Sequence, residues 1–253
     1  MKIIKIMSLC LGGLLCVTSA KAEVLNVALT SSSVPFSYQN ETGEQVGFNM
    51  DIAKSICEKI KASCTFYYLR FPEILPLVAE GKIDFALPNM LKTPERAAKA
   101  AFTVPYWRST SSFVGPVDYN FTSAKRIFEK DKICAIQNTR QMNYLQSMSG
   151  GKQDHLISTK TTAATIDALK DGTCRFYLMP TMQSLSFLQS EKGKGFGYLG
   201  KPISDQGLGG DVHMIVRKDR PALLKKIDAA LQEMVHEGVH EQITRKYFPF
   251  SIL

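Results

Sequence analysis

A threonine, a proline, a glutamate and an arginine follow one another at residues 93–96, shortly after an apolar segment at Ile83–Leu87. Thr93 suits the N-cap of a helix, and Pro94 suits the first helical position because its missing N–H would be unpaired there. The pattern predicts a strand, a loop and a helix whose first turn carries Arg96. A guanidinium beside the free N–H groups of a helix N-terminus can hold a small carboxylate. The alternative at this stage is an arginine in a solvated turn.

A second set of residues, 236–240, matches the H-E-x-x-H pattern. In zinc peptidases both histidines lie on one face of a continuous helix, and the glutamate acts as general base. Gly238 predicts a helix end inside the motif, and few residues follow that would supply a third ligand. We therefore predict no metal site and no catalysis here. The glycine cluster at 193–200 lies between predicted loops, which is the wrong context for a nucleotide-binding turn.

The first 22 residues combine Lys2 and Lys5, an apolar run and an A-x-A ending at Ala22. This organisation is typical of a cleavable signal peptide, and its apolar run is too short to span a bilayer. We expect a mature, periplasmic chain from Glu23. Loss of Lys2, Lys5 and Lys21 lowers the formal charge from +8 to +5. These charges form no dense basic block, so we expect no nucleic-acid partner.

Four cysteines remain beyond the signal segment, Cys57, Cys64, Cys134 and Cys174. An even number in an exported chain predicts disulfides, and no C-x-x-C spacing supports a metal site. Cys57 and Cys64 form the natural local pair. Cys134 and Cys174 each lie in or beside a short apolar strand, and these strands could be neighbours in one sheet.

Strand and helix patterns alternate along the chain, which predicts mainly parallel sheets covered by helices. The predicted strands are 24–29, 64–69, 83–87, an extended segment 105–117, 133–137, 175–179 and 212–216. The predicted helices are 49–60, 72–80, 123–130, 140–148, 162–170, 181–191, 221–237 and 239–247. The glycine-rich stretch 192–210 is predicted to be a loop.

Several segments, in this order, resemble the bacterial extracellular solute-binding proteins that bind polar amino acids for ABC importers. They are Pro35-Phe36-Ser37-Tyr38 with Gly43, Gly47-Phe48-Asn49-Met50-Asp51-Ile52-Ala53, Gly81-Lys82-Ile83-Asp84, Thr93-Pro94-Glu95-Arg96, Phe102-Thr103-Val104-Pro105-Tyr106, and the closing stretch from Val216-Arg217-Lys218-Asp219 to Lys246-Tyr247-Phe248. Asn49 replaces an acidic residue of the family pattern. The match covers nearly the whole mature chain.

The resemblance implies an α/β fold of the type 2 periplasmic-binding-protein class, a two-lobed clamshell in which helices flank a mainly parallel sheet in each lobe. It places lobe 1 at 23–114 and 212–253 and lobe 2 at 115–211. Two hinge strands, near Phe113–Val117 and Gly209–His213, would connect them.

The resemblance also assigns candidate ligand-binding residues. Arg96 would pair with the ligand carboxylate, and Phe71 would stack against the ligand. Asn89 and Leu91 would line the site, Leu91 mainly through its backbone. Residues 138–140 occupy the place of a glycine-containing turn whose N–H groups cover the carboxylate. Asn138 tolerates the left-handed conformation needed there, Thr139 keeps the family role, and Arg140 adds a second cation.

Three departures affect the part of the site that would hold an α-amino group. The usual acidic position corresponds to Pro180, and a second aromatic ring is replaced by Ser33. The family's G-x-x-D-A strand reads 172–176, G-T-C-R-F. Because an unpaired buried ammonium is costly, we expect a small anion or carboxylate-bearing solute rather than a standard α-amino acid. Asp205 or Asp211 would be the amine partner if the local alignment is shifted.

We therefore predict a monomeric periplasmic binding protein without cofactor or catalytic activity. It would close its hinge on a small-molecule ligand and dock on a membrane ABC permease. The alternatives are an accessory or sensory binding protein without a transporter, and a cleft dehydratase acting on a cyclic carboxylate.

Overall fold

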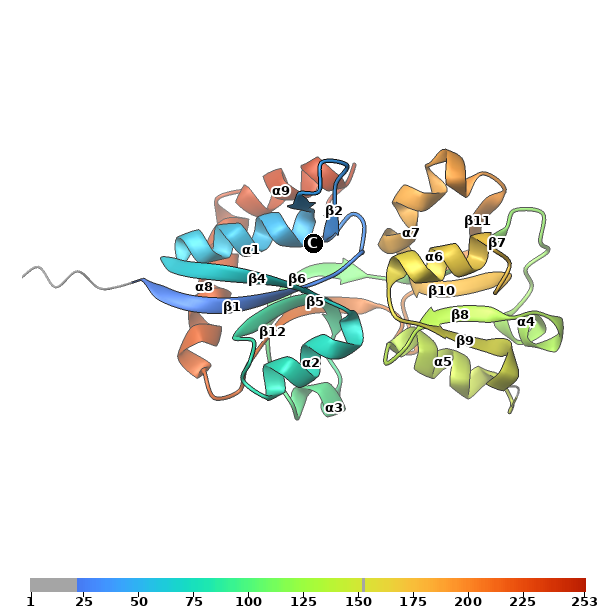
Figure 1. The fold of residues 1–253 in the computed structure, drawn as a ribbon, viewed down its shortest axis with the longest axis horizontal. Coiled ribbons are helices and arrows are strands. Elements are labelled where there is room, and N and C mark those ends of the chain that lie inside the picture. The colour runs from blue at the N-terminus through green and yellow to red at the C-terminus, as the bar shows by residue number, and fades with distance from the viewer. Residues whose placement is uncertain (1–21, 152) are drawn as a thin grey trace, which may run out of the picture.

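The computed structural model describes residues 22–151 and 153–253. The expected signal segment, apart from residue 22, lies outside the described residues. Two five-stranded sheets form two lobes, which lie side by side along the long axis of the molecule (Figure 1). No helix of the described part is both long and apolar enough to cross a membrane.

Lobe 1 is built on the sheet of order β4-β1-β5-β12-β6. Its strands are β1 (Glu23–Thr30), β4 (Ala62–Leu69), β5 (Phe85–Leu91), β6 (Ala101–Ser109) and β12 (Gly210–Val216). β1 is parallel to β4 and β5, whereas β12 is antiparallel to both of its neighbours. A short hairpin of β2 (Tyr38–Gln39) and β3 (Gln45–Val46) adds to this lobe.

Lobe 2 is built on the sheet of order β11-β7-β10-β8-β9. Its strands are β7 (Ser111–Pro116), β8 (Ile133–Ile136), β9 (Leu156–Thr159), β10 (Phe176–Pro180) and β11 (Phe196–Ile203). Here β7 is the strand that runs against its neighbours, while β10, β8 and β9 are parallel. The predicted two-lobed α/β fold with mainly parallel sheets is therefore confirmed.

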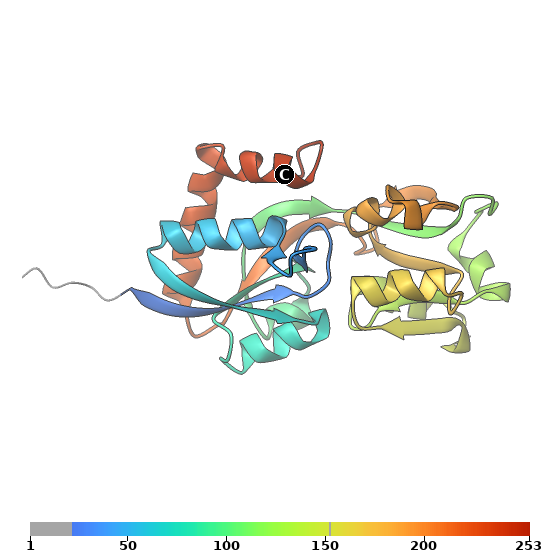
Figure 2. The same cartoon turned by 45° about the horizontal axis from the view of Figure 1, so that its top comes forward.

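Helices cover both faces of each sheet (Figure 2). Those of lobe 1 are α1 (Phe48–Lys59), α2 (Phe71–Ala79), α3 (Pro94–Ala97), α8 (Pro221–His236) and α9 (Val239–Tyr247). Those of lobe 2 are α4 (Ala124–Lys130), α5 (Arg140–Met148), α6 (Thr162–Lys170), α7 (Thr181–Leu188) and the 3-10 turns η1 (Gln153–His155) and η2 (Glu191–Gly193).

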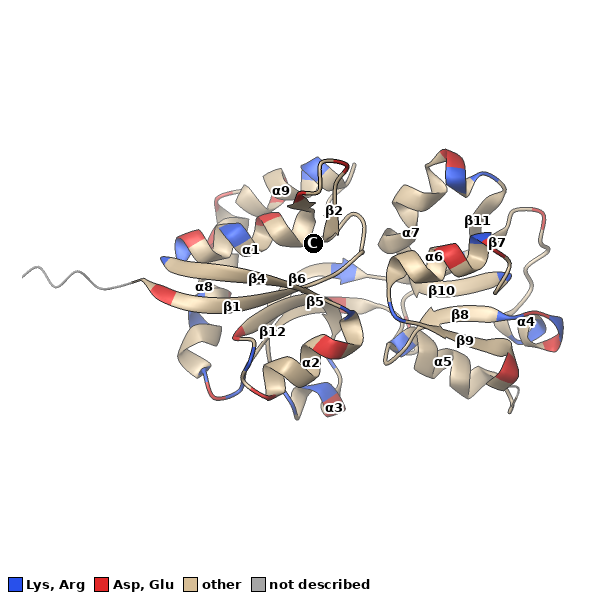
Figure 3. Cartoon of the chain, in the orientation of Figure 1, with Lys and Arg blue, Asp and Glu red and all other residues tan. Residues whose placement is uncertain are grey.

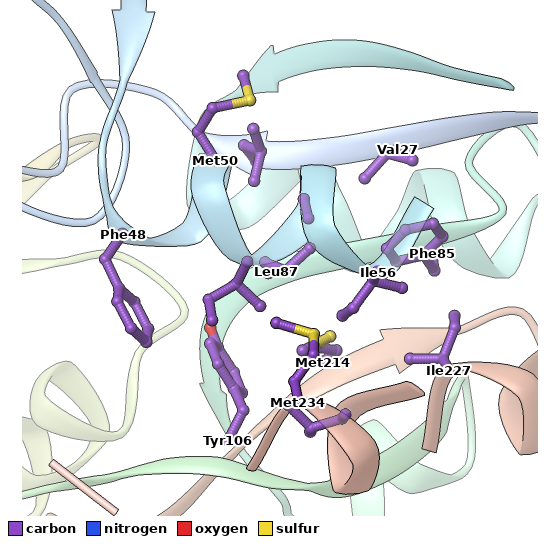
Figure 4. Close-up of a cluster of buried hydrophobic side chains, with 14 of the residues drawn as sticks. Val27, Phe48, Met50, Ile56, Phe85, Leu87, Tyr106, Met214, Ile227 and Met234 are labelled. Atoms are coloured by element: carbon purple, nitrogen blue, oxygen red, sulfur yellow. The ribbon is translucent and has the colours of Figure 1, made fainter. Parts of the chain in front are cut away.

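The main core of lobe 1 lies between its sheet and α1, α8 and α9. Figure 4 shows part of it, with Val27, Phe85 and Leu87 of the sheet facing Ile56 of α1 and Met234 of α8. These side chains are fully buried or nearly so. Burial of each of these side chains stabilises the folded state by about 1.5–3 kcal/mol. This packing makes lobe 1 a rigid support for the site residues that it carries.

Lobe 2 has two smaller cores, one on each face of its sheet. Ile133 and Ala135 of β8 pack with α4 and α5, while Cys134 and Ile136 pack with α6 and α7. This alternation follows from the period of two of a β-strand. As a result, α5 and α6 begin at the same end of the sheet but on opposite faces.

The predicted local pair Cys57–Cys64 is confirmed as a disulfide, and Cys134 and Cys174, whose pairing the sequence left open, form a second one. Cys57 of α1 joins Cys64 of β4 across a sequence separation of 7, and Cys134 of β8 joins Cys174, just before β10, across a separation of 40. One bridge lies in each lobe.

The prediction of a loop over 192–210 was wrong, because Phe196–Ile203 forms the strand β11. Gly197 and Gly200 suggested a loop, but β11 is an edge strand paired only to β7, and its register shifts after Leu199. Edge strands and bulges tolerate glycine. The strand β9 was missed altogether, and the helix predicted over 181–191 ends at Leu188.

The extended segment predicted over 105–117 is two strands in different sheets. β6 belongs to lobe 1 and β7 to lobe 2, so the chain first crosses between the lobes at Thr110, before the expected boundary at 114 and 115. It returns through 204–209, between β11 and β12. Thr181 holds the first crossing, because its N–H donates to the Thr110 carbonyl oxygen at 2.8 Å and the two hydroxyls are 2.8 Å apart.

Candidate functional site

A cleft between the lobes brings together the predicted ligand-binding residues. Its empty volume is about 600 Å³, open solvent included. The seven predicted residues all line it: Ser33, Phe71, Asn89, Leu91, Arg96, Thr139 and Arg140. It is also lined by Thr30, Ser31, Pro88, Ser109, Ile136, Gln141, Lys160, Thr161, Thr162, Pro180 and Gln183.

Arg96 occupies the first turn of α3, as the sequence predicted. Thr93 is the N-cap, and its Oγ1 accepts from the Arg96 N–H at 3.3 Å. The guanidinium donates from Nη1 to the Leu91 carbonyl oxygen at 2.9 Å and from Nη2 to the Asn138 carbonyl oxygen of lobe 2 at 3.0 Å. It also lies over the Phe71 ring, 5.5 Å from the centroid. Arg96 is therefore fixed in orientation and reaches across the cleft.

Burial in the cleft, with repulsion from Arg140, lowers the pKa of Arg96 to about 10, partly opposed by Glu95. The side chain stays protonated at neutral pH, but its charge lacks a carboxylate partner within 4 Å among the described residues. A desolvated cation of this kind is stabilised by an anionic ligand.

A buried amide network holds Asn89 on the lobe 1 wall. Asn49 Nδ2 donates to the Leu87 carbonyl oxygen at 3.0 Å and to Asn89 Oδ1 at 2.9 Å. The Tyr106 hydroxyl lies 3.1 Å from Asn89 Oδ1 and 3.2 Å from Asn49 Oδ1. Burial raises the pKa of Tyr106, so this hydroxyl stays protonated. Asn89 Nδ2 has no hydrogen-bond partner among the described residues.

The lobe 2 wall is formed where three strands end and three helices begin. β8 leads into α5, β9 into α6 and β10 into α7, and the cleft lining includes Thr139, Thr161 and Pro180 at the respective N-caps. Helix N-termini carry partial positive charge, which favours anions. Asn138 has φ 61°, so the left-handed turn predicted before Thr139 is present.

Arg140 lies against the segment that returns to lobe 1. Its Nε donates to the Gly207 carbonyl oxygen at 3.3 Å, and Gly207 has φ 72°. A Cβ at Gly207 would overlap the Arg140 guanidinium, which could shift, so glycine is required here mainly by the left-handed conformation.

The lining has no acidic side chain among the described residues. Pro180, which the family resemblance places at the usual acidic position, lines the cleft, but neither Asp205 nor Asp211 does. Asp211 instead pairs with Arg108, Nε to Oδ1 at 3.3 Å. The alternative amine partners considered from the sequence therefore lie outside the cleft.

The helix α6 was predicted with its observed start, but the sequence did not assign Lys160 or the start of this helix to the cleft. Lys160 follows β9, the strand that was not predicted, and it is an exposed side chain that lines the cleft. Thr161 Oγ1 accepts from the Ala164 N–H at 3.1 Å and caps α6. The helix predicted from residue 162 and the threonine before it were the available signal, because a threonine N-cap marks a helix start.

The H-E-x-x-H residues lie on two helices. Gly238, with φ 76°, separates α8 from α9, as predicted. His236 is exposed, whereas His240 is buried with Nε2 2.7 Å from the Tyr106 carbonyl oxygen. Burial lowers the pKa of His240. The two imidazoles thus do not share the continuous helical face that a zinc peptidase requires.

Residues 25–250 match the model of the bacterial extracellular solute-binding proteins, family 3. The histidine-binding periplasmic protein of Escherichia coli K12 is 25% identical over 244 residues, covering 92% of this chain and 91% of the relative. The ABC transporter arginine-binding protein 1 of the same strain is 27% identical over 232 residues, covering 91% and 93%.

Solved structures show the same fold. An ancestral arginine-binding protein bound to arginine has a TM-score of 0.82 at 24% identity, covering 89% of this chain and 98% of that one. A histidine kinase sensor domain has a TM-score of 0.80 at 17% identity, covering 90% and 96%. With the matched family model spanning almost all of the described chain, this protein belongs to the bacterial extracellular solute-binding proteins of family 3.

Proposed function

We propose that the protein captures a small carboxylate-bearing solute in the periplasm for an ABC importer. Arg96 is the observation that supports this most directly. Its guanidinium is oriented by two carbonyl oxygens and the Phe71 ring, yet it lacks a carboxylate partner among the described residues. A ligand carboxylate would complete it, with Thr139 and the N–H groups at the start of α5 closing from lobe 2.

Transport is supported by the relatives, whose names include periplasmic binding proteins and an ABC transporter component. We propose that the lobes, 23–110 with 210–253 and 111–203, move about Thr110 and 204–209. A monomer presenting both lobes would dock transiently on the permease. Residues 1–22 would direct export and be removed.

Binding without catalysis is the simpler proposal for this cleft. Among the described lining residues there is no histidine, carboxylate or thiol to transfer a proton or attack a substrate. This disfavours the dehydratase alternative, which would have to use Lys160 or an arginine as its acid or base.

The ligand class is tested by a thermal-shift screen of residues 23–253 against amino acids, mono- and dicarboxylates and small phosphorylated acids. A ligand at 100 times its dissociation constant stabilises the folded state by about 2.7 kcal/mol. Stabilisation by carboxylates that disappears in Arg96→Ala is expected. If no carboxylate stabilises the protein, or if Arg96→Ala binds normally, the proposed function is wrong. Scattering that shows compaction on ligand addition tests closure.

A further inference from the structure

Three cations line the cleft, and none of them forms an ion pair with a carboxylate within 4 Å among the described residues, although Glu95 lies close enough to Arg96 and Arg140 to lower their repulsion in part. Arg96 comes from α3, Arg140 from the start of α5 and Lys160 from the loop before α6. Most arginines elsewhere in the described chain pair with carboxylates, as Arg220 does with Asp84 at 3.0 Å. The cleft thus combines three positive charges that the protein itself leaves without an ion pair.

The lobe 2 cations are placed at two separate positions. α5 packs on one face of the lobe 2 sheet and α6 packs on the other. Arg140, at the start of α5, and Lys160, just before α6, therefore lie on opposite sides of this end of the sheet. Figure 3 shows basic positions at the start of α5 and in the loop before α6, on the edge that faces lobe 1. One carboxylate bound at Arg96 would therefore leave the start of α6 without an anion.

Two uncharged side chains that line the cleft also have buried polar atoms without hydrogen-bond partners in the described chain. Ser33 is 3% exposed, and its Oγ has no partner in the described chain. The orientation of Asn89 follows from Asn49. The Asn49 atom that faces the Leu87 carbonyl oxygen must be the donor Nδ2, and it also faces the Asn89 side chain. That Asn89 atom must be Oδ1, which leaves Asn89 Nδ2 as a free donor.

These groups disfavour a cationic or zwitterionic ligand. A protonated amine needs a carboxylate or a set of acceptors, and the lining supplies none of the former. Three like charges around a small volume raise the free energy of the unliganded cleft, and an additional ligand cation would increase this repulsion. A second ligand anion would reduce it.

We propose, building on the function proposed above, that the cleft selects a small dianion that lacks a protonated amine. One carboxylate binds Arg96 with Asn89 Nδ2, and the second anionic group binds near Lys160, Thr161 and the start of α6. Dicarboxylates and phosphorylated carboxylates share this chemistry.

Calorimetric titrations of the mature chain would compare glutarate with valerate, glutamate and 3-phosphoglycerate. We expect glutarate or 3-phosphoglycerate to bind at least tenfold more tightly than valerate and glutamate. Whichever of these two dianions binds more tightly shows whether the second anionic group is a carboxylate or a phosphate. Lys160→Gln should weaken the preferred dianion about tenfold and valerate less than twofold. Lys125→Gln, an exposed lysine of α4 away from the cleft, should change neither.

Equal or tighter binding of valerate or glutamate would overturn the dianion proposal while leaving Arg96-dependent capture of a carboxylate intact. The dianion proposal would also be overturned if Lys160→Gln weakened the binding of valerate as much as that of the preferred dianion. Loss of all carboxylate binding would instead overturn the proposed function itself.

Asn89→Asp tests the assigned donor. Aspartate keeps the oxygen that accepts from Asn49 Nδ2, tolerates the positive φ of 57° at this position, and replaces the donor Nδ2 with an acceptor oxygen. We expect the affinity ratio of glutarate to glutamate to fall at least fivefold, a change that general loosening of the wall would not cause. An unchanged ratio, with binding retained, would overturn the role of Asn89 Nδ2.

Discussion

The two walls of the cleft differ in how firmly their charged groups are held. On lobe 1, Arg96 is held within its own lobe by the Leu91 carbonyl oxygen and the Phe71 ring, and Asn89 is fixed by Asn49 and Tyr106. On lobe 2, Arg140 has a single hydrogen bond at 3.3 Å, and Lys160 is exposed. The lobe 1 wall is preorganised, whereas the lobe 2 wall can adjust.

This difference separates affinity from selectivity. A preorganised cation loses little conformational freedom on binding, so most of its interaction with a carboxylate contributes to affinity. The less constrained cations Arg140 and Lys160 contribute less each but determine which second group is accepted. The predicted departures from the family pattern that affect the amine part of the site are also unevenly distributed. Pro180 and residues 172–176 belong to lobe 2, whereas only Ser33 belongs to lobe 1.

The lobes that carry the two walls each contain one disulfide, and the two disulfides close loops of different length. Removing each disulfide in turn would measure how much it contributes to the free energy of unfolding. Loop-closure entropy gives about 4 kcal/mol for Cys134–Cys174, which closes 40 residues, and about 2 kcal/mol for Cys57–Cys64, which closes 7. Paired alanine substitutions should lower the free energy of unfolding in this order, as measured by urea denaturation. Equal losses would mean that local packing around α1 and β8, and not loop length, decides the stability of the two lobes.

Arg96→Gln should have the largest effect on binding. Loss of a desolvated, oriented ion pair costs about 3 kcal/mol, or roughly a hundredfold in Kd. The unliganded protein should keep its melting temperature, because the substitution also removes a charge that burial disfavours. Calorimetry and thermal melting check the two parts. A large fall in melting temperature would show that the Arg96–Asn138 contact is structural and not a ligand-binding feature.

The sequence predicted the lobe 1 wall well because local signals suffice there. The N-cap Thr93, Pro94 at the first helical position and the strand before them place Arg96 in the chain, and the structure shows this cap. The same kind of local signal identified one residue of lobe 2, Asn138, from its tolerance of positive φ.

The lobe 2 wall was predicted less completely, because its residues meet only through long-range pairing. β9 is a four-residue edge strand, too short for a period of two to be recognised, and Lys160 depends on it. β11 contains glycines that local rules assign to loops. The free donor of Asn89 depends on contacts with Asn49, 40 residues away, which no sequence pattern reports.

Arg140→Gln should weaken binding less than Arg96→Gln does. A half-exposed cation with one long hydrogen bond contributes about 1 kcal/mol to an ion pair, or about fivefold in Kd. The ratio of the two effects, measured by calorimetry with one dicarboxylate, tests the difference between the walls. If Arg140→Gln costs as much as Arg96→Gln, both walls are equally preorganised and the comparison fails.

The pH dependence of ligand affinity should show the smallest of the predicted changes. It tests directly whether Arg96 of lobe 1 and Arg140 of lobe 2 repel each other. Burial and Arg140 lower the pKa of Arg96 to about 10, so Arg96 is charged below this pH and loses its proton above it. Affinity for a monocarboxylate, which stays ionised throughout, should therefore be constant from about pH 7.5 to 9 and fall as pH rises through 10. Arg140→Gln removes the repulsion and should move the midpoint to higher pH. The titrations should use a Lys160→Gln background, because lysines also lose charge in this range, with circular dichroism confirming that the fold persists. A midpoint that does not move in Arg140→Gln would mean that solvent already screens the two arginines, so that each wall binds its anion independently.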